Sequence, residues 1–355
     1  MTDPPLPDLS DMTREQLTKF LVDAGEPRFR ANQVFRWIWQ KLATSFDEMT
    51  DLPATLRRRL AEIARIGAVT AEREDLSRDG TRKFLVRLGD GRAVESVLIP
   101  DATRMTLCIS SQVGCALACA FCATGPMGLI RNLTPGEIAG QVAFAVRTLR
   151  EAPHPGHPDR ERPVTNVVYM GMGEPLHNYD AMLASLRILT DEQGLAFPAR
   201  RITVSTVGLV PQMQALGEEM AVTLAVSLHA PTDAIRGRIM PINKKHDLAA
   251  VIAACRAFPL KSRARITFEY VMLAGVNDSL ANADQLASAI DGLRCKVNLI
   301  PWNEHEGADF KRPTDTATTA FAQRLEARGV TCMVRTTRGR DIAAACGQLA
   351  LHSGS

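Results

Sequence analysis

The sequence has no long apolar run and carries little net charge. None of its 355 residues lies in a stretch apolar enough to cross a bilayer, and its start, MTDPPLPDLSDM, contains no apolar signal segment. We therefore expect a cytoplasmic protein without a membrane-spanning segment. The formal net charge of +3 excludes a strong overall positive field, so any binding to nucleic acid has to use local basic patches. The sequence also lacks internal repeats, which excludes a repeat architecture.

Three of the eight cysteines stand in one short run, CALACAFC. Cys115, Cys119 and Cys122 have the spacing C-x3-C-x2-C. Three thiolates can bind three irons of a 4Fe-4S cluster and leave the fourth iron open to a small molecule. Structural zinc is the alternative, but zinc takes four ligands and no fourth Cys or His lies close by in the sequence. Disulfides are not expected in a protein without an export signal. The spacing therefore favours an iron-sulfur site.

Residues 12–66 are expected to form a small helical unit. Leu17, Phe20 and Leu21 recur at helical spacing, and further apolar residues repeat in the same way up to residue 63. Arginines and lysines stand among aromatic residues between positions 28 and 59. Such a mixture suits an RNA backbone and stacked bases, but an ordinary amphipathic unit with a solvated basic face explains it equally well.

A β-hairpin is expected next in the chain. Residues 83–88 and 93–99 are apolar or alternating, and Gly89, Asp90 and Gly91 stand between them. Glu95 interrupts the second strand. It either faces solvent or places a carboxylate beside the cysteine run.

From about residue 104 the pattern becomes a repetition of strands and helices. Thr134-Pro135-Gly136-Glu137 is a helix start, with an N-cap, a proline in the first turn and a glutamate three residues on. Short strands without strict alternation, separated by helices, indicate a parallel sheet covered on both faces. About six units suggest a partial (β/α) barrel, with its chemistry at the carboxyl ends of the strands. The expected strands are 106–109, 166–170, 202–206, 221–228, 266–273 and 297–300.

Polar residues follow several of these strands. Gly173 and Glu174 stand in a glycine-rich turn, where a carboxylate could accept hydrogen bonds from an ammonium group. The other strand ends carry Ser205, Ser227-Leu228-His229 and Asn303. Each could be an isolated loop residue, but their shared position at strand ends favours one pocket.

The remaining cysteines are ambiguous by themselves. Cys108 ends a strand seven residues before Cys115, and Cys346 follows a basic run that includes Arg335, Arg338 and Arg340. A single cysteine is more often a buried core residue than a nucleophile. Cys255, Cys295 and Cys332 keep that interpretation.

Taken together, these motifs resemble the radical S-adenosylmethionine (SAM) RNA methyltransferases of the RlmN family, which methylate carbon 2 of adenosine in 23S rRNA and tRNA. The resemblance spans nearly the whole chain. It is carried, in family order, by CALACAFCATG, MGMGEPLHNYD, ITVSTVGLVP, AVSLHAPTD, MPINKK, NLIPWN and TRGRDIAAACGQL. It implies a partial (β/α)6-type radical SAM barrel with a small N-terminal helical domain and a short β-hairpin linker. The implied parts are residues 1–66 (RNA-binding domain), 67–100 (hairpin), 101–341 (barrel) and 342–355 (C-terminal segment with Cys346).

The resemblance also implies a role for each site residue. Cys115, Cys119 and Cys122 would ligate the 4Fe-4S cluster. Cys346 would receive a methyl group, Cys108 would later form a transient disulfide with it, and Glu95 would accept a proton. The implied SAM contacts are Gly173, Glu174, Ser205, Ser227, Leu228, His229 and Asn303.

The implied reaction consumes two SAM molecules per turnover and needs an external reductant such as flavodoxin or ferredoxin. We expect a monomer, with the basic residues of 28–59 and 335–340 on RNA phosphates. Two enzymatic alternatives stay open: a related enzyme that methylates carbon 8 of the same rRNA adenosine, and a radical SAM enzyme with a non-RNA substrate. A zinc-containing RNA-binding protein is the non-enzymatic alternative.

Overall fold

The computed structural model describes residues 6–350, except 158, 160, 262, 263 and 306. The described helices are α1 (Arg14–Asp23), α2 (Phe29–Trp39), α3 (Ala54–Ile63), α4 (Pro135–Glu151), α5 (Tyr179–Thr190), α6 (Val210–Glu219), α7 (Asp233–Ile239), α8 (Leu248–Ala257), α9 (Leu280–Ala289) and α10 (Asp315–Ala327). The described strands are β1 (Thr70–Leu76), β2 (Arg82–Arg87), β3 (Ala93–Asp101), β4 (Arg104–Cys108), β5 (Gln112–Gly114), β6 (Leu129–Asn132), β7 (Asn166–Tyr169), β8 (Ile202–Thr206), β9 (Thr223–Ser227), β10 (Ile266–Met272), β11 (Cys295–Pro301) and β12 (Cys332–Val334). None of the described helices is long and apolar enough to cross a membrane.

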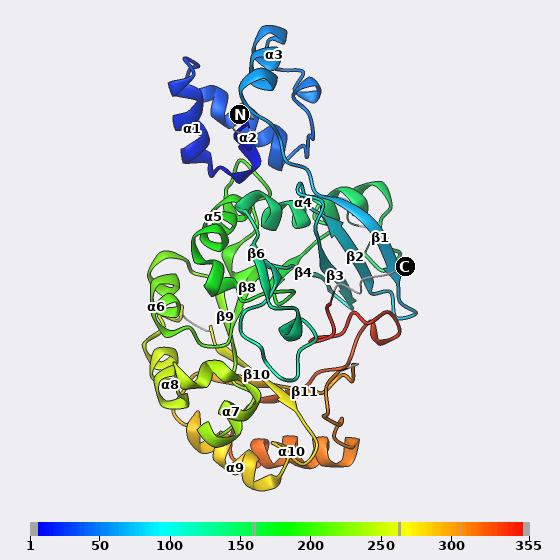
Figure 1. The fold of residues 1–355 in the computed structure, drawn as a ribbon, viewed down its shortest axis with the longest axis vertical. Coiled ribbons are helices and arrows are strands. Elements are labelled where there is room, and N and C mark those ends of the chain that lie inside the picture. The colour runs from blue at the N-terminus through cyan, green and yellow to red at the C-terminus, as the bar shows by residue number, and fades with distance from the viewer. Residues whose placement is uncertain (1–5, 158, 160, 262–263, 306, 351–355) are drawn as a thin grey trace.

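One large curved sheet organises the molecule (Figure 1). Its strand order is β1-β2-β3-β4-β7-β8-β9-β10-β11-β12, and all neighbours from β4 to β12 run parallel. Helices α5, α6, α8, α9 and α10 lie around the outside of the parallel strands. The expected partial barrel is therefore confirmed, and all six expected strands are present.

The alternation of side chains along each strand decides which residues face the apolar core and which face the inside of the barrel. All seven residues of β10 are buried, because helices cover one face and the barrel interior encloses the other. Phe268, Tyr270 and Met272 belong to the main apolar core, whereas the alternate residues Glu269 and Val271 line the central cavity.

The predicted hairpin exists, but it is continuous with the barrel sheet. β2 pairs with β3, and β3 pairs antiparallel with β4, the first barrel strand. Three short elements were not expected from the sequence: β1, which adds a further antiparallel strand; the β5–β6 hairpin, which frames the cysteine run; and β12, at the far edge of the sheet.

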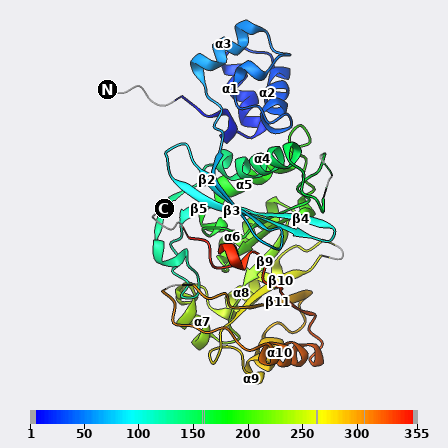
Figure 2. The ribbon, with the colours of Figure 1, turned by 90° about the vertical axis from the view of Figure 1, so that its right-hand side faces the viewer.

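The helical unit made by α1, α2 and α3 sits at one end of the molecule, on α4 and α5 (Figure 2). The helix start predicted at Thr134 is confirmed: its side chain accepts from the N–H of Glu137 at 3.2 Å. The next turn joins the two parts, because the Asp11 carboxylate accepts from the N–H of Gly136 at 2.9 Å. A Cβ atom at Gly136 would stand 2.6 Å from the Ser10 hydroxyl, so this contact requires glycine.

Candidate active site

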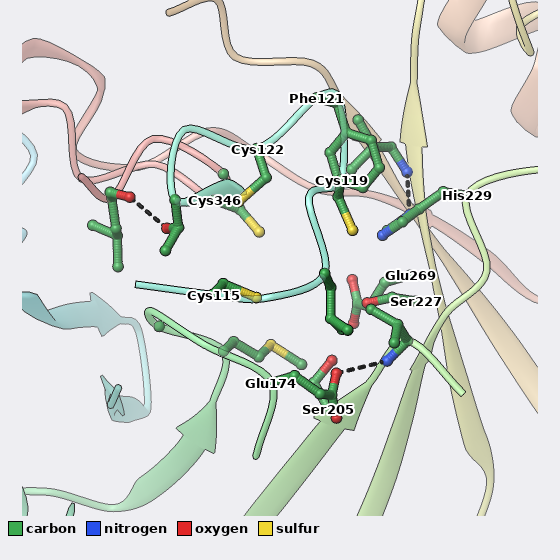
Figure 3. A pocket seen from close by; sticks show the side chains of 18 of the residues that line it. Cys115, Cys119, Phe121, Cys122, Glu174, Ser205, Ser227, His229, Glu269 and Cys346 are labelled. Atoms are coloured by element: carbon green, nitrogen blue, oxygen red, sulfur yellow. Dashed lines mark hydrogen bonds between the residues drawn. The ribbon is translucent and has the colours of Figure 1, made fainter. Parts of the chain in front are cut away.

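A cavity of about 140 Å³ opens at the carboxyl ends of the barrel strands (Figure 3). It brings together ten residues singled out from the sequence: Cys115, Cys119, Cys122, Gly173, Glu174, Ser205, Ser227, His229, Asn303 and Cys346. Leu228 is fully buried behind the lining. Cys108 and Glu95 lie outside this cavity, and each is placed by separate contacts described below.

The three-cysteine run forms a compact loop above the cavity. The N–H of Cys115 donates to the Gly128 carbonyl at 2.9 Å, and the N–H of Cys122 donates to the Cys119 carbonyl at 3.1 Å. The three sulfur atoms point toward the same space. Burial raises the pKa of the Cys115 thiol to about 11 and the pKa of Cys119 further, so neither thiol ionises readily by itself. Such thiols lose their protons on binding iron or another metal ion.

The chemistry of this donor set fits a cluster with one open iron. Among the residues described, no group of three or more His, Cys, Asp or Glu side chains could hold a single metal ion. A 4Fe-4S cluster makes a different demand, because each thiolate binds its own iron. Three thiolates on one loop meet that demand and would leave one iron without a protein ligand.

Glu174 lies on the opposite wall of the cavity, in the glycine-rich turn after β7. Its Oε1 accepts from the N–H of Leu176 at 3.0 Å and its Oε2 from the N–H of Val207 at 2.9 Å. Burial raises the pKa of this carboxyl to about 7. The turn needs glycine at 173, because φ is +96° there and a Cβ atom would stand 2.5 Å from Gln112.

His229 is held as a neutral ring at the end of β9. Its backbone is left-handed, with φ of 58°, and its Nδ1 accepts from the N–H of Val271 at 3.0 Å. Burial lowers the pKa of the imidazole to about 3, so the ring is neutral. Because Nδ1 accepts a hydrogen bond, the proton of the neutral ring is on Nε2. The ring packs edge-on against Phe121 of the cysteine loop, with 4.7 Å between centroids.

The cavity also contains a carboxylate that the sequence analysis missed. Glu269 on β10 is buried, and its Oε1 accepts from Asn298 Nδ2 at 3.0 Å. Its buried Oε2 has no hydrogen-bond partner in the described structure. With Glu174 it gives the lining two carboxylates, and no Lys or Arg is found among the described lining residues. This excess of negative charge suits a ligand with an ammonium and a sulfonium group, as SAM has. Glu269 Oε2 can accept a hydrogen bond from such a ligand.

Cys346 enters the cavity on the C-terminal segment, residues 343–350. Asn303 Nδ2 donates to the Cys346 carbonyl at 3.2 Å, and the Gly347 carbonyl accepts from the N–H of Ala123 in the cysteine loop at 2.8 Å. Thr124 Oγ1 donates to the Leu349 carbonyl at 2.6 Å. The segment is thus fastened to both the cysteine loop and the end of β11.

Cys108 meets Cys346 in a second, smaller cavity of about 30 Å³. Arg335 and apolar residues of β3 and β7 complete its lining. Burial raises the pKa of Cys108 to about 12, while the nearby Arg335 guanidinium opposes the shift. Cys346 is exposed, unlike Cys108, and shares the cavity with Arg335. Two cysteines 238 positions apart in the sequence therefore share one cavity beside the cysteine loop.

Glu95 is buried, which excludes the expectation that it faces solvent. Lys83 on β2 forms an ion pair with it, with Nζ 3.0 Å from Oε1. The N–H of Ala350 donates to Oε2 at 3.0 Å, so the C-terminal segment lies against this carboxylate. Lys83 was also missed from the sequence. The available signal was two opposite charges diagonal to each other on one face of the hairpin.

Comparisons with known proteins cover nearly the whole chain. The profile of the ribosomal RNA large subunit methyltransferase N-terminal domain (RlmN_N) matches residues 7–66, and that of the radical SAM superfamily matches residues 109–287. A protein of Geobacter sulfurreducens named dual-specificity RNA methyltransferase RlmN is 52% identical over 342 residues, which are 96% of this chain and 91% of that protein. Its namesake in Anaeromyxobacter dehalogenans is also 52% identical, over 98% of this chain and 93% of its own. The chain belongs to the RlmN family.

A solved relative of this family has the same fold. The crystal structure of a radical SAM methyltransferase from Sphaerobacter thermophilus aligns with a TM-score of 0.90 and 49% identity, over 97% of this chain and 99% of that one. The chain is accordingly a radical SAM methyltransferase, and membership in that superfamily implies a 4Fe-4S cluster and SAM.

Proposed function

We propose that this enzyme makes 2-methyladenosine in 23S rRNA and in tRNA, with Cys346 as the methyl carrier. One observation carries the proposal: Cys108 and Cys346 meet in one cavity beside the three-cysteine loop. A radical SAM enzyme that only cleaves SAM needs the three cysteines alone. The RNA specificity is supported by the names of the curated relatives and by the N-terminal domain match.

The cavity residues are assigned as follows. Cys115, Cys119 and Cys122 hold the cluster through three irons. Glu174 accepts from the SAM ammonium group across the cavity, and further SAM contacts come from the lining residues Gly173, Ser205, Ser227, His229 and Asn303. Leu228 stays a proposed contact, although it does not line the cavity. When bound, the cluster and SAM supply a methyl group and a radical that can abstract hydrogen. The neutral His229 can donate from Nε2 to this ligand, since its Nδ1 is already engaged.

The chain's own residues carry the methyl carbon to the base and release it. The Cys346 thiolate accepts the methyl group, which would then lose a hydrogen atom to the SAM-derived radical before its carbon bonds to adenine C2. Glu95 accepts the C2 proton, and the one electron left on the adduct would return to the oxidised cluster. The Cys108 thiolate then attacks the Cys346 sulfur, so an S–S bond forms and the S–C bond breaks. The electron pair of that bond passes to the carbon, which takes up a proton to become the methyl group.

Two placements bear on these steps. Cys108 needs no large movement, because it already shares a cavity with Cys346. Glu95 can reach the base only after a movement, because its Oε2 accepts from the N–H of Ala350 and it does not line the SAM cavity. The C-terminal segment therefore has to release Glu95 when adenine enters.

The disulfide left after turnover requires two electrons from a reductant such as flavodoxin or ferredoxin. We expect a monomer that works in the cytoplasm, where its RNA substrates are made.

The proposal is tested in three steps. The protein is reconstituted anaerobically with iron and sulfide and then incubated with SAM, dithionite and either 23S rRNA or tRNA. The nucleosides are then analysed by mass spectrometry. We expect 2-methyladenosine in both RNAs from the wild-type protein and from the control Cys332→Ala, since Cys332 lies at the outer edge of the sheet. Cys346→Ala should give none. 8-Methyladenosine would contradict the carbon-2 assignment, and 5′-deoxyadenosine without methylated RNA would contradict the substrate.

A further inference from the structure

Arg236 on α7 is a fully buried arginine whose side chain binds only neutral acceptors. Its Nε donates to the Leu228 carbonyl at 3.3 Å, and its Nη2 donates to the Val207 carbonyl at 2.5 Å. Its Nη1 donates to Asn243 Oδ1 at 2.8 Å and to the His246 carbonyl at 3.1 Å. Among the described residues, no carboxylate forms an ion pair with it.

A buried cation of this kind needs an explanation. Arginine keeps its proton in proteins, so the positive charge cannot be relieved by deprotonation. Taking a charge out of water costs several kcal/mol unless an opposite charge compensates it. Four neutral oxygens accept from four of the five N–H groups of Arg236 but leave its charge unbalanced. The balance has to come from negative charge nearby.

The cysteine loop, whose thiols become negatively charged on binding iron, lies against α7. The carbonyl of Ile239, one turn after Arg236, accepts from the N–H of Ala120 at 2.9 Å. Phe121 packs with Ile239 in the same apolar cluster. As a thiolate, Cys119 would act on the Arg236 guanidinium together with Asp233 and Asp247 at the starts of α7 and α8.

We propose that Arg236 is a positioning residue with two effects: it fastens the ends of β8 and β9 beneath the SAM cavity, and it supplies the buried counter-charge that raises the reduction potential of the cluster. The inference rests on the assignment of Cys119 as a cluster ligand. Reduction adds one negative charge to a group already carrying three thiolates, and a fixed positive charge in a dry surrounding favours that addition. The fastening follows from its bonds to Val207 and Leu228, which stand next to the SAM contacts on both strands.

Three variants separate the charge from the hydrogen bonds. Arg236→Gln removes the charge, and Arg236→Lys keeps the charge but loses the planar fork. Arg238→Gln removes the same charge from an exposed position on the same helix and serves as the control. The readout is the midpoint potential of the reconstituted cluster, followed by the EPR signal of its reduced form without RNA. Equilibrium binding of SAM is measured in parallel.

At a fixed solution potential, we expect Arg236→Gln to lower the ratio of reduced to oxidised cluster about tenfold. This corresponds to a midpoint potential lower by about 59 mV for one electron. Arg236→Lys and Arg238→Gln should keep the wild-type potential. Both Arg236 variants should bind SAM several-fold more weakly, because both lose contacts to the strand ends.

An unmoved potential in Arg236→Gln overturns the inference, and so does an equal fall in Arg236→Lys, since packing alone would then explain it. Should the glutamine variant fail to fold, the lysine variant still decides: an unchanged potential with weakened SAM binding supports the inference, and a lowered potential overturns it. A wild-type protein without any cluster signal would instead overturn the ligand assignment, and this inference with it.

Discussion

The ion pair between Lys83 and Glu95 gives a prediction whose magnitude follows from the structure. Nζ and Oε1 are 3.0 Å apart, and the two side chains are only 5% and 3% exposed. Replacing Lys83 by methionine keeps the volume but leaves a carboxylate in the interior without its ammonium partner. Breaking a buried pair from one side costs about 3–5 kcal/mol, whereas removing both charges often costs little. We therefore expect Lys83→Met to lower the free energy of unfolding by about 3 kcal/mol or more.

Urea unfolding of the cluster-free protein measures this loss, with the slope m checked for constancy. The double variant Lys83→Met/Glu95→Gln should recover most of the stability. Lys19→Met is the control, because the Lys19–Asp23 pair is exposed and should contribute about 0.5 kcal/mol or less. A cost for Lys83→Met below about 1 kcal/mol, or a double variant no more stable than the single one, would refute the reasoning.

The same variant tests whether the pair serves the reaction. Removing the Lys83 ammonium from beside this buried carboxylate favours its protonated form, and a protonated Glu95 could no longer accept a proton from the base. Neither residue lines the SAM cavity. Lys83→Met should therefore reduce the rate of RNA methylation while leaving the affinity for SAM unchanged. Equal loss of both would mean that the substitution has distorted the barrel.

Three further predictions concern single positions. Cys108→Ala should accumulate a covalent protein–RNA adduct on denaturing gels, because the carrier sulfur of Cys346 cannot be released; no adduct, with Cys346 methylated and SAM cleaved, counts against the resolving role. Thr134→Ala removes the N-cap of α4 and should cost about 1 kcal/mol in urea unfolding, with Thr134→Ser near wild type; equal losses in both would exclude the cap as the cause. Burial raises the pKa of Asp79, but hydrogen bonds, led by that with Thr81, outweigh it and lower the pKa to about 2. Its stabilisation is therefore present above pH 4 and lost as pH falls from 4 to 2, and Asp79→Asn should flatten this part of the acid-unfolding curve.

The barrel strands could be predicted because their local signal agrees with their surroundings. β10 is apolar over most of its length, and the structure buries all seven of its residues. α4 begins at Thr134 because the capping pattern there is purely local. The pocket could also be predicted from the sequence, because parallel strands bring their carboxyl ends to one edge of a sheet. Residues at those ends then meet however far apart they are in the sequence.

The parts that sequence reasoning missed depend on contacts between distant segments. β1 reads TAEREDL, a charged and largely exposed run that becomes a strand only by pairing with β2. Lys83 and Arg236 belong to residue types that are mostly exposed. No local pattern marks Arg236 as buried, and for Lys83 the signal is the opposite charge of Glu95 on the next strand. Their burial follows from partners on other elements, Glu95 for the one and the strand-end carbonyls for the other.

The incomplete barrel leaves room for Cys346, the proposed methyl carrier, beside the cavity. β4 and β11 are the first and last of the six expected parallel strands, and Cys346 lies between residues of both: Cys108 ends β4, and Asn303 follows β11. The C-terminal segment reaches this place because the described sheet stays open there, and it is fastened across the opening to the cysteine loop and to Glu95. A closed eight-stranded barrel would fill that position with backbone. In the proposed reaction the Cys346 sulfur would face SAM, then the base, then the Cys108 thiol. A segment that can move away from the sheet suits these three neighbours better than a strand, because each step would require a different position.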